Sequence, residues 1–214
     1  MAAVLAALFT VAAPADAGTQ KKSVSSCPPP HSRVLLADEQ AQVFELPESG
    51  PGPFRREEVG GCAYHHGRAF MFGEPLGEPS PQGNSGVSSE TLAGAVVAYE
   101  SSFMPAVESR QVGGAVIVVR DLRSGRVLHK VPSGTSSGGL GIGPALSLVV
   151  KSDGAVAWTT SALPQDGYYQ VHALDKSGSR MLAIGESINP YSLALAGSTL
   201  YWTQEGKPFS APLN

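Results

Sequence analysis

One stretch of the chain matches a catalytic serine motif. Residues Gly134-Thr135-Ser136-Ser137-Gly138 fit Gly-x-Ser-x-Gly, in which a strained strand-to-helix turn exposes a nucleophilic serine. Here glycine and serine surround the motif, and no helical pattern follows it. The adjoining stretch 139–143 is also glycine-rich but lacks the Gly-Lys-Ser/Thr of a phosphate loop. We therefore interpret both stretches as loops and predict no catalytic or cofactor-binding residue.

Histidines and aspartates are the other groups that could carry acid–base or metal chemistry. The adjacent pair His65-His66 lacks the i, i+4 helical spacing of a zinc protease, and adjacent side chains in extended chain point to opposite faces. We expect that pair at a surface turn, and His129 and His172 as exposed partners of polar groups. The remaining candidates are His31, Asp38, Glu39, Asp121, Asp153 and Asp175.

The aspartates all fall at predicted turns, where accepting backbone N–H bonds explains their presence. We therefore predict no metal site and no cofactor. Two alternatives stay open, because sequence spacing tests neither of them. One is metal binding by histidines, and the other is a pair of carboxylates brought together from different strands.

The chain has two cysteines, Cys27 and Cys62. In an exported protein an isolated pair most simply forms a disulfide. The bridge would tie an N-terminal arm, residues 18–32, to the first strand-rich unit, and would stabilise the fold by about 3–4 kcal/mol. The alternative is two buried free thiols. Two cysteines are too few for a typical zinc site, and no base marks either one as a nucleophile.

The N-terminus has the pattern of a signal peptide. An apolar run from Ala2 to Ala13 precedes the small-x-small site Ala15-Asp16-Ala17, which predicts cleavage before Gly18 and removal of residues 1–17. No lysine or arginine precedes the run. The alternatives are a buried helix or an uncleaved anchor, although the run is shorter than the roughly 18 residues of a bilayer span. We predict a secreted or extracytoplasmic protein, in the periplasmic or cell-wall space, with no membrane span after cleavage.

Composition bounds the fold and the partners. The 214 residues suffice for one domain, and 25 glycines and 17 prolines predict many turns. A net charge of −3 leaves no basic footprint for nucleic acid. We therefore expect an unknown protein or small-molecule ligand as partner, and no nucleic acid.

A recurring pattern predicts the architecture. The segments 148–159 and 193–203 each contain a strand, a tight turn and a strand that ends in aromatic-Thr, at a spacing of about 45 residues that is typical of propeller blades. Glycine-bearing turns at 65–68, 121–125 and 175–178 repeat in register. We predict an all-β, β-propeller-like domain over 33–214, with four blade units at about 33–73, 91–132, 146–186 and 191–214. The last unit lacks its outer strand.

The segments between these strands are expected to be loops. We predict surface loops at 47–60, 74–90 and 133–144, because they lack periodicity and are rich in polar residues, glycine or proline. A single helical turn is expected at 89–95. We predict that Tyr99, Trp158 and Trp202 are inter-blade core residues, and the alternative is a ligand-stacking role.

The stretch 146–213 resembles the TolB-like and WD40-like propeller repeats. The resemblance rests on Asp153-Gly154, Trp158, the strand Val171–Asp175 and Gly178. Ser152 stands where the repeat often has proline, and the last unit lacks a comparable aspartate. The whole chain is also similar to uncharacterised exported proteins of high-GC bacteria that end in a Tyr-Trp-Thr-Gln segment. The resemblance implies a propeller fold and carries no catalytic residue.

These observations favour a binding or scaffolding module over an enzyme, because propellers recognise partners through loops at one face. Two alternatives remain. One is an extracytoplasmic hydrolase or lyase with its site at the propeller axis. The other is a truncated propeller copy without a function of its own, as the incomplete last unit suggests.

Overall fold

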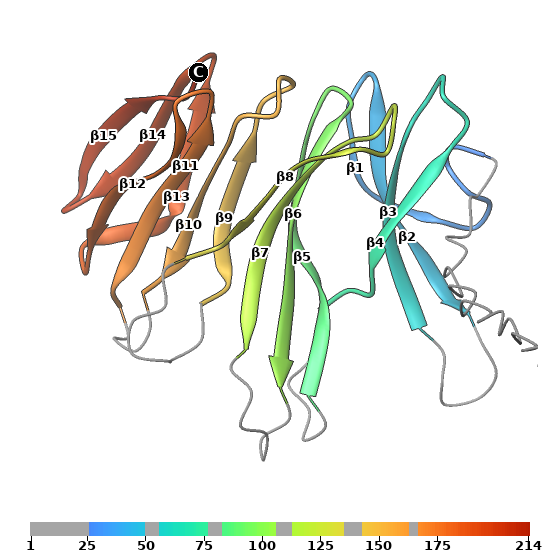
Figure 1. Ribbon diagram of the computed structural model, residues 1–214, viewed down its shortest axis with the longest axis horizontal. Helices are drawn as coiled ribbons and strands as arrows, with labels where there is room; N and C mark the ends of the chain where they lie inside the picture. The colour runs from blue at the N-terminus through green and yellow to red at the C-terminus, as the bar shows by residue number, and fades with distance from the viewer. Residues whose placement is uncertain (1–25, 50–55, 77–82, 106–112, 135–142, 163–166) are drawn as a thin grey trace, which may run out of the picture.

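The computed structural model describes residues 26–49, 56–76, 83–105, 113–134, 143–162 and 167–214. These residues form fifteen strands in four antiparallel sheets and contain no helix (Figure 1). The all-β prediction is therefore confirmed. The predicted signal peptide 1–17 and residues 135–138 of the serine motif lie outside the described residues.

Each sheet is built from consecutive strands of the chain. The first sheet contains β1 (Arg33–Ala37), β2 (Ala41–Ser49), β3 (Arg56–Ala63) and β4 (Ala69–Gly73). The second contains β5 (Gly83–Ala93), β6 (Val96–Pro105), β7 (Gly114–Asp121) and β8 (Val127–Pro132). The third contains β9 (Ala145–Val150), β10 (Val156–Ser161), β11 (Tyr169–Asp175) and β12 (Gly178–Gly185). The fourth contains β13 (Ile188–Ala196), β14 (Thr199–Gln204) and β15 (Lys207–Pro212).

The hairpin turns form where the sequence predicts them, because aspartate carboxylates hold the backbone there. Asp121 Oδ1 accepts the N–H of Arg123 at 3.0 Å, and Asp175 Oδ1 accepts the N–H of Ser177 at 2.8 Å. Gly178 then takes a φ of +94°, which residues with a side chain rarely adopt. The predicted function of these aspartates as turn caps is confirmed.

Among the described residues, three hydrophobic core clusters lie between consecutive sheets, one for each pair. Val43, Val59, Val97 and Tyr99 are among the buried residues between the first and second sheets. The second and third sheets enclose a cluster that includes Ile117, Val156 and Trp158, and the third and fourth enclose one that includes Val171, Leu200 and Trp202. Figure 1 shows the resulting row, with the first and fourth sheets at opposite ends.

The first strands of the four sheets lie next to one another. β1 contacts β5, β5 contacts β9, and β9 contacts β13. The later strands of each sheet extend away from this line, and the second, third and fourth sheets each pack face to face on the sheet before. The four sheets therefore fan out from one side of the molecule.

Several predicted boundaries are wrong. Residues 83–93 form strand β5 rather than part of a loop at 74–90 followed by a helical turn at 89–95. The strand has a bulge between Ser88 and Thr91, and Ser89 has a φ of +55°. The serine and glycine residues of β5 interrupt the alternation of apolar and polar residues that would mark a strand in the sequence. In the structure, pairing with β6 holds the segment extended. β2 and β3 likewise extend into the predicted loop 47–60, and β13 begins three residues before the predicted unit.

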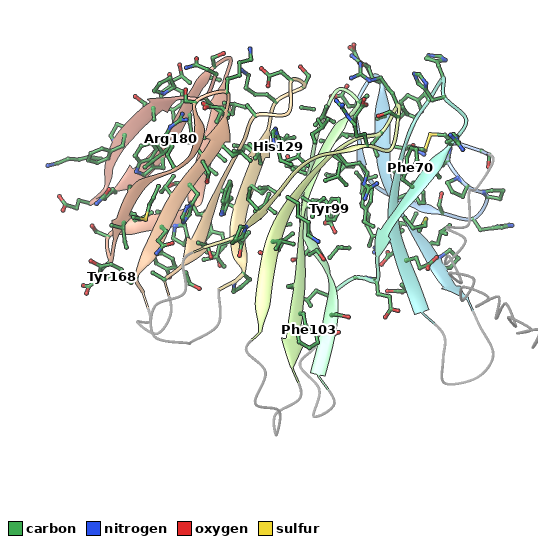
Figure 2. All side chains as sticks on the ribbon, in the orientation of Figure 1. Phe70, Tyr99, Phe103, His129, Tyr168 and Arg180 are labelled. Carbon is green, nitrogen blue, oxygen red and sulfur yellow. A yellow bond between two sulfur atoms is a disulfide. The ribbon has the colours of Figure 1, made fainter. Side chains whose placement is uncertain are left out.

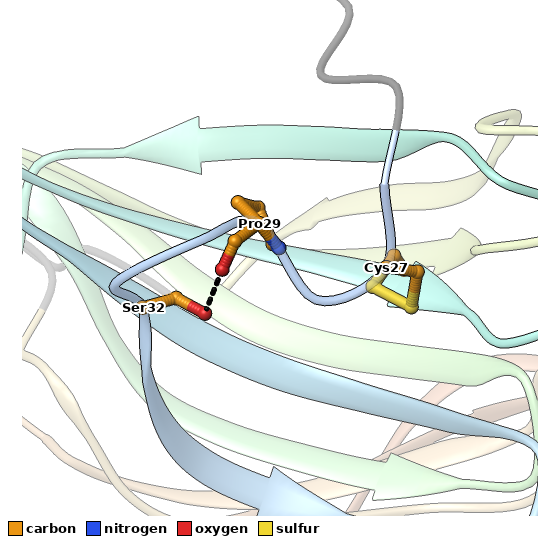
Figure 3. Close-up of a disulfide and its surroundings, with 4 residues drawn as sticks. Cys27, Pro29 and Ser32 are labelled. Atoms are coloured by element: carbon orange, nitrogen blue, oxygen red, sulfur yellow. Dashed lines mark hydrogen bonds between the residues drawn. A yellow bond between two sulfur atoms is a disulfide. The ribbon is translucent and has the colours of Figure 1, made fainter.

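The N-terminal arm is fixed to the outer face of the first sheet. Cys27 and Cys62 form a disulfide with an S–S distance of 2.03 Å, which confirms the predicted bridge and excludes free thiols. Ser32 Oγ donates a hydrogen bond to the Pro29 carbonyl at 2.8 Å (Figure 3). Cys27 packs with a small cluster containing Phe44 and Cys62, and both of these side chains are fully buried. The described part of the arm therefore caps one end of the row.

Candidate functional site

The carboxyl group of Glu100 on β6 is strongly perturbed by burial. The side chain is fully buried on the face of the second sheet that packs against the third. One carboxylate oxygen accepts hydrogen bonds from the Ala145 N–H and the Ser88 hydroxyl. Burial raises the pKa of Glu100 to about 7, although these two hydrogen bonds oppose the rise. Within the described part of the chain, the other oxygen has no partner.

A buried histidine lies on the third sheet, facing the second. The ring of His172 stacks on Trp158 with a centroid distance of 5.2 Å, and its Nε2 lies 2.8 Å from Gln170 Oε1. Burial lowers the pKa of His172 to about 4, so the ring is neutral at physiological pH. The expectation that His172 is exposed is wrong, because its strand is covered by the second sheet.

An ion pair joins the third sheet to the end of the chain. Asp175 accepts bonds from Arg180 Nη1 at 2.6 Å and Nη2 at 2.8 Å, and the same carboxylate accepts the Asn214 N–H at 2.8 Å. The Arg180 guanidinium holds the pKa of Asp175 far below its usual range. Arg180 Nη2 also donates to the Pro212 carbonyl at 2.8 Å. We call this set the C-terminal latch, and it fixes β15 to the third sheet.

A small pocket of about 110 Å³ adjoins the latch. Its lining residues are His129, Asp153, Ala155, Asp175, Lys176 and Asn214, and Figure 2 shows His129 and Arg180 toward the same edge of the molecule. The described residues contain no group of three His, Cys, Asp or Glu side chains placed to hold a metal ion. The Asp175 carboxylate already accepts hydrogen bonds within the C-terminal latch. This pocket therefore offers few side-chain groups that could bind a ligand.

A larger pocket, of about 290 Å³, opens where β4 leads into the second sheet. We call it the serine pocket, and its lining residues are Phe72, Gly73, Glu74, Ser85, Gly86, Val87, Ser101 and Ser102. The chain after β4 runs along the free edge of β5, where the Val87 N–H donates to the Glu74 carbonyl at 2.8 Å and the Leu76 N–H to the Val87 carbonyl at 2.9 Å.

Gly86 allows this close approach of two backbone segments. A Cβ atom at position 86 would lie 2.7 Å from both the N and the Cα of Leu76 and 2.8 Å from the Glu74 carbonyl oxygen. Those contacts are too short for any side chain, and the neighbours are backbone atoms that cannot rotate away. The glycine therefore shapes the wall of the serine pocket.

The lining of the serine pocket suits binding of a polar, uncharged group. Ser85, Ser101 and Ser102 are among its lining residues, and a serine hydroxyl can both donate and accept a hydrogen bond. The Ser102 Oγ is buried and has no partner among the described residues. Phe72 forms the apolar wall and is held by stacking on Tyr99, with centroids 4.5 Å apart.

The three predicted aromatic residues are all buried, each in a different inter-sheet cluster. Tyr99 lies between the first and second sheets, Trp158 between the second and third, and Trp202 between the third and fourth. Trp158 Nε1 also donates to the Ser133 carbonyl. Because the two tryptophans lie in separate clusters, they do not form one ligand-stacking pair.

The serine pocket is the site that sequence analysis missed. Its residues come from 72–74, 85–87 and 101–102, and part of this region is assigned to a loop on sequence. Gly86 inside a serine-rich stretch is the one hint, since an isolated glycine in a strand often marks a close backbone approach. No helical segment in the described residues has the length and hydropathy to span a bilayer. No protein-family model and no curated protein matches the chain.

Proposed function

We propose that this protein is an exported, propeller-like module that binds a small, uncharged, hydroxyl-rich molecule in the serine pocket. One observation carries the proposal: a pocket of about 290 Å³ is lined in part by Ser102, whose buried hydroxyl has no partner among the described residues. That volume is close to the lower end of small-molecule sites, about 300–1,000 Å³. A monosaccharide unit has the size and the hydrogen-bonding groups to fit.

Binding is favoured over catalysis because of where the reactive groups lie. Asp121, Asp153 and Asp175 accept backbone bonds at turns, and His172 is buried against Trp158. A serine becomes a nucleophile only beside a general base. Among the described residues, Glu74 is the one titratable residue that lines the serine pocket, so the serines there are better suited to hydrogen bonding.

The propeller-like arrangement and export are parts of the same proposal. The sheets follow one another in chain order with their first strands adjacent, which is how blades stand around an axis. The disulfide is typical of oxidising compartments, and the leader pattern agrees with it. Mass spectrometry of protein from its host should find the N-terminus at or near Gly18, and intact protein in the cytoplasm would contradict export.

Titration calorimetry and ligand-observed NMR test the binding site. N-acetylglucosamine and glucose serve as uncharged probes, and glucuronate serves as the charged probe. We expect millimolar binding of an uncharged probe and weaker binding of glucuronate. Ser102→Ala should weaken binding about fivefold to tenfold, the effect of losing one hydrogen bond of about 1–1.5 kcal/mol.

Ser210→Ala is the matched control, because it removes an exposed hydroxyl on β15 outside the pocket and should leave binding unchanged. Two results would contradict the proposal. One is that no uncharged probe binds, and the other is that Ser102→Ala and Ser210→Ala bind equally well.

A further inference from the structure

Ala145, the first residue of β9, is held to the second sheet through both of its backbone groups. Its N–H donates to the carboxyl group of Glu100, and its carbonyl accepts the Ser89 hydroxyl at 2.9 Å. The Ser88 hydroxyl donates to the same carboxyl group. We call these four residues the Ala145 clamp. Because β9 contacts both β5 and β6 (Figure 1), the clamp joins the second and third sheets at the point where the chain enters the third.

Other buried hydrogen bonds hold the chain just before β9, and all of them join neutral groups. The Ser133 N–H donates to the Ala115 carbonyl at 2.9 Å, and Ser133 Oγ donates to the Gly143 carbonyl at 3.2 Å. The same carbonyl accepts a hydrogen bond from Thr160 Oγ1 at 2.8 Å. The side chains of Ser133 and Thr160 are fully buried. Since none of these groups titrates near neutral pH, these contacts persist whatever the charge of the clamp.

Glu100 is the one ionisable member of the clamp. Its side chain is fully buried, and within the described residues its Oε1 atom has no partner. A neutral carboxyl group keeps its bonds to Ala145 and Ser88 and buries no charge. An ionised group leaves negative charge on an oxygen without a hydrogen-bond donor, which is costly in a buried position. Water relieves this cost only if it reaches Oε1, and that requires the clamp to open.

The described elements packed against β6 bring no positive charge to Glu100. The neighbouring strand β9 contains no titratable residue. On β7, Asp121 lies at the far hairpin turn, and Arg120 lies on the opposite face, where it bonds the Tyr99 hydroxyl. On β5, Glu90 lies in the bulge and is half-buried, so its charge would oppose ionisation of Glu100. An ionised Glu100 is therefore not neutralised within the closed clamp.

We propose that the Ala145 clamp is a pH-sensitive switch at the junction of the second and third sheets. With Glu100 protonated, the clamp holds the start of β9 to β5 and β6. Loss of the proton favours the open clamp, while the neutral contacts of Ser133 and Gly143 keep the two sheets joined. The pKa of Glu100 is about 7 in the closed clamp against an ordinary 4.5. The stability that the proton gives the clamp is therefore complete below pH 4.5 and is lost as the pH rises to 7.

These two pKa values set the size of the effect and distinguish local from wider opening. If only the clamp opens, the equilibrium constant for opening should rise about fortyfold between pH 5 and pH 7. Opening of the whole third sheet would also expose His172, which faces the second sheet from β11. Its pKa is lowered from 6.5 to about 4 by burial, so His172 takes up a proton on exposure and offsets most of the change. A large pH effect at Ala145 therefore marks opening of the clamp alone.

Amide hydrogen exchange of ¹⁵N-labelled mature protein at pH 5, 6 and 7 tests the inference. After correction for the intrinsic exchange rate, protection of the Ala145 N–H should fall about fortyfold from pH 5 to pH 7. Protection of Leu200, fully buried on β14, should change less than about threefold, because wider opening also exposes His172. Glu100→Gln should remove the pH dependence at Ala145. Glu90→Gln, the same substitution in the neighbouring bulge, is the matched control and should keep it.

Two measurements keep the inference testable if Glu100→Gln fails to fold. Ser89→Ala removes a neutral bond to Ala145, so it should lower protection at every pH and leave the fortyfold ratio unchanged. The carboxyl ¹³C resonance of Glu100 in wild type should titrate with a midpoint at about pH 7.

Any one of four results would overturn the inference. They are constant protection of Ala145 across this range, a fall that Leu200 shares equally, a folded Glu100→Gln that keeps the wild-type pH dependence, and a Glu100 carboxyl that titrates near its ordinary value. No saccharide is present in these measurements, so the outcome does not depend on binding in the serine pocket.

Discussion

The clearest energetic prediction concerns Glu100, because its burial couples folding to proton binding. The folded-state pKa is about 7 against a usual value of 4.5. Between these two values the folded protein holds a proton that the unfolded chain releases. As the pH rises from 4.5 to 7, the contribution of Glu100 to the free energy of unfolding therefore falls by about 1.4 kcal/mol per pH unit. Over the whole interval the loss is about 3 kcal/mol.

His172 has the opposite effect over almost the same interval. Its pKa is lowered by burial from 6.5 to about 4, so the unfolded chain binds a proton that the folded protein does not. Stability from His172 is fully present above pH 6.5 and is lost as the pH falls toward 4. Between pH 4.5 and 6.5 the two slopes nearly cancel, and wild type should show little pH dependence there.

Replacing Glu100 with glutamine separates these effects. Glutamine keeps an oxygen for the Ala145 N–H and cannot ionise. Between pH 4.5 and pH 8 the free energy of unfolding of Glu100→Gln should rise by about 3 kcal/mol relative to that of wild type. The variant's own free energy of unfolding should increase between pH 4.5 and 6.5, because only the effect of His172 remains.

Urea unfolding followed by tryptophan fluorescence at pH 4.5, 6.5 and 8 measures these differences. Glu186→Gln, at an exposed turn position, is the matched control and should track wild type at every pH. If the stability of Glu100→Gln runs parallel to that of wild type across this range, Glu100 is not a buried carboxyl with a raised pKa.

Substitutions at three further positions test the packing. Gly86→Ala should destabilise the protein by about 1–3 kcal/mol and abolish probe binding. Gly114→Ala is the control and should cost much less, because no atom lies within 4 Å of its new Cβ. Equal melting temperatures of the two variants would contradict the close backbone approach at Gly86. Trp158→Phe should cost about 1 kcal/mol or more for the lost indole hydrogen bond, and Trp158→Ala about 3–5 kcal/mol; near-wild-type melts would place this ring outside the core. Cys62→Ser should lower stability by about 4 kcal/mol, given the separation of 35 residues, and an unchanged urea midpoint would show that the arm is held by other contacts.

The parts of the fold that the sequence predicts are those with strong local patterns. The strands with Val, Leu and aromatic residues and the Asp-initiated turns were predictable, because alternation and turn capping operate over a few residues. The disulfide followed from the isolated pair of cysteines together with the leader pattern that predicts export. β5 was not predictable, because Ser88, Ser89 and Glu90 hide its alternation, and only pairing with β6 makes it a strand.

The candidate site depends on contacts that no local pattern encodes. The serine pocket exists because the chain after β4 binds the free edge of β5, which the hydrogen bonds of Val87 establish. The pKa values of Glu100 and His172 likewise come from burial between two sheets. The turn position of Asp175 was predictable, but its bond to Asn214 joins residues 39 positions apart.

Binding in the serine pocket is the central claim, and amide chemical-shift mapping tests it most directly. Uniformly ¹⁵N-labelled protein, titrated with N-acetylglucosamine, should show saturable shifts that cluster at Gly73, residues 85–87 and residues 101–102. Amides of the fourth sheet should stay unchanged at constant protein concentration. An absence of saturable shifts, or shifts that cluster around the C-terminal latch, would contradict the account.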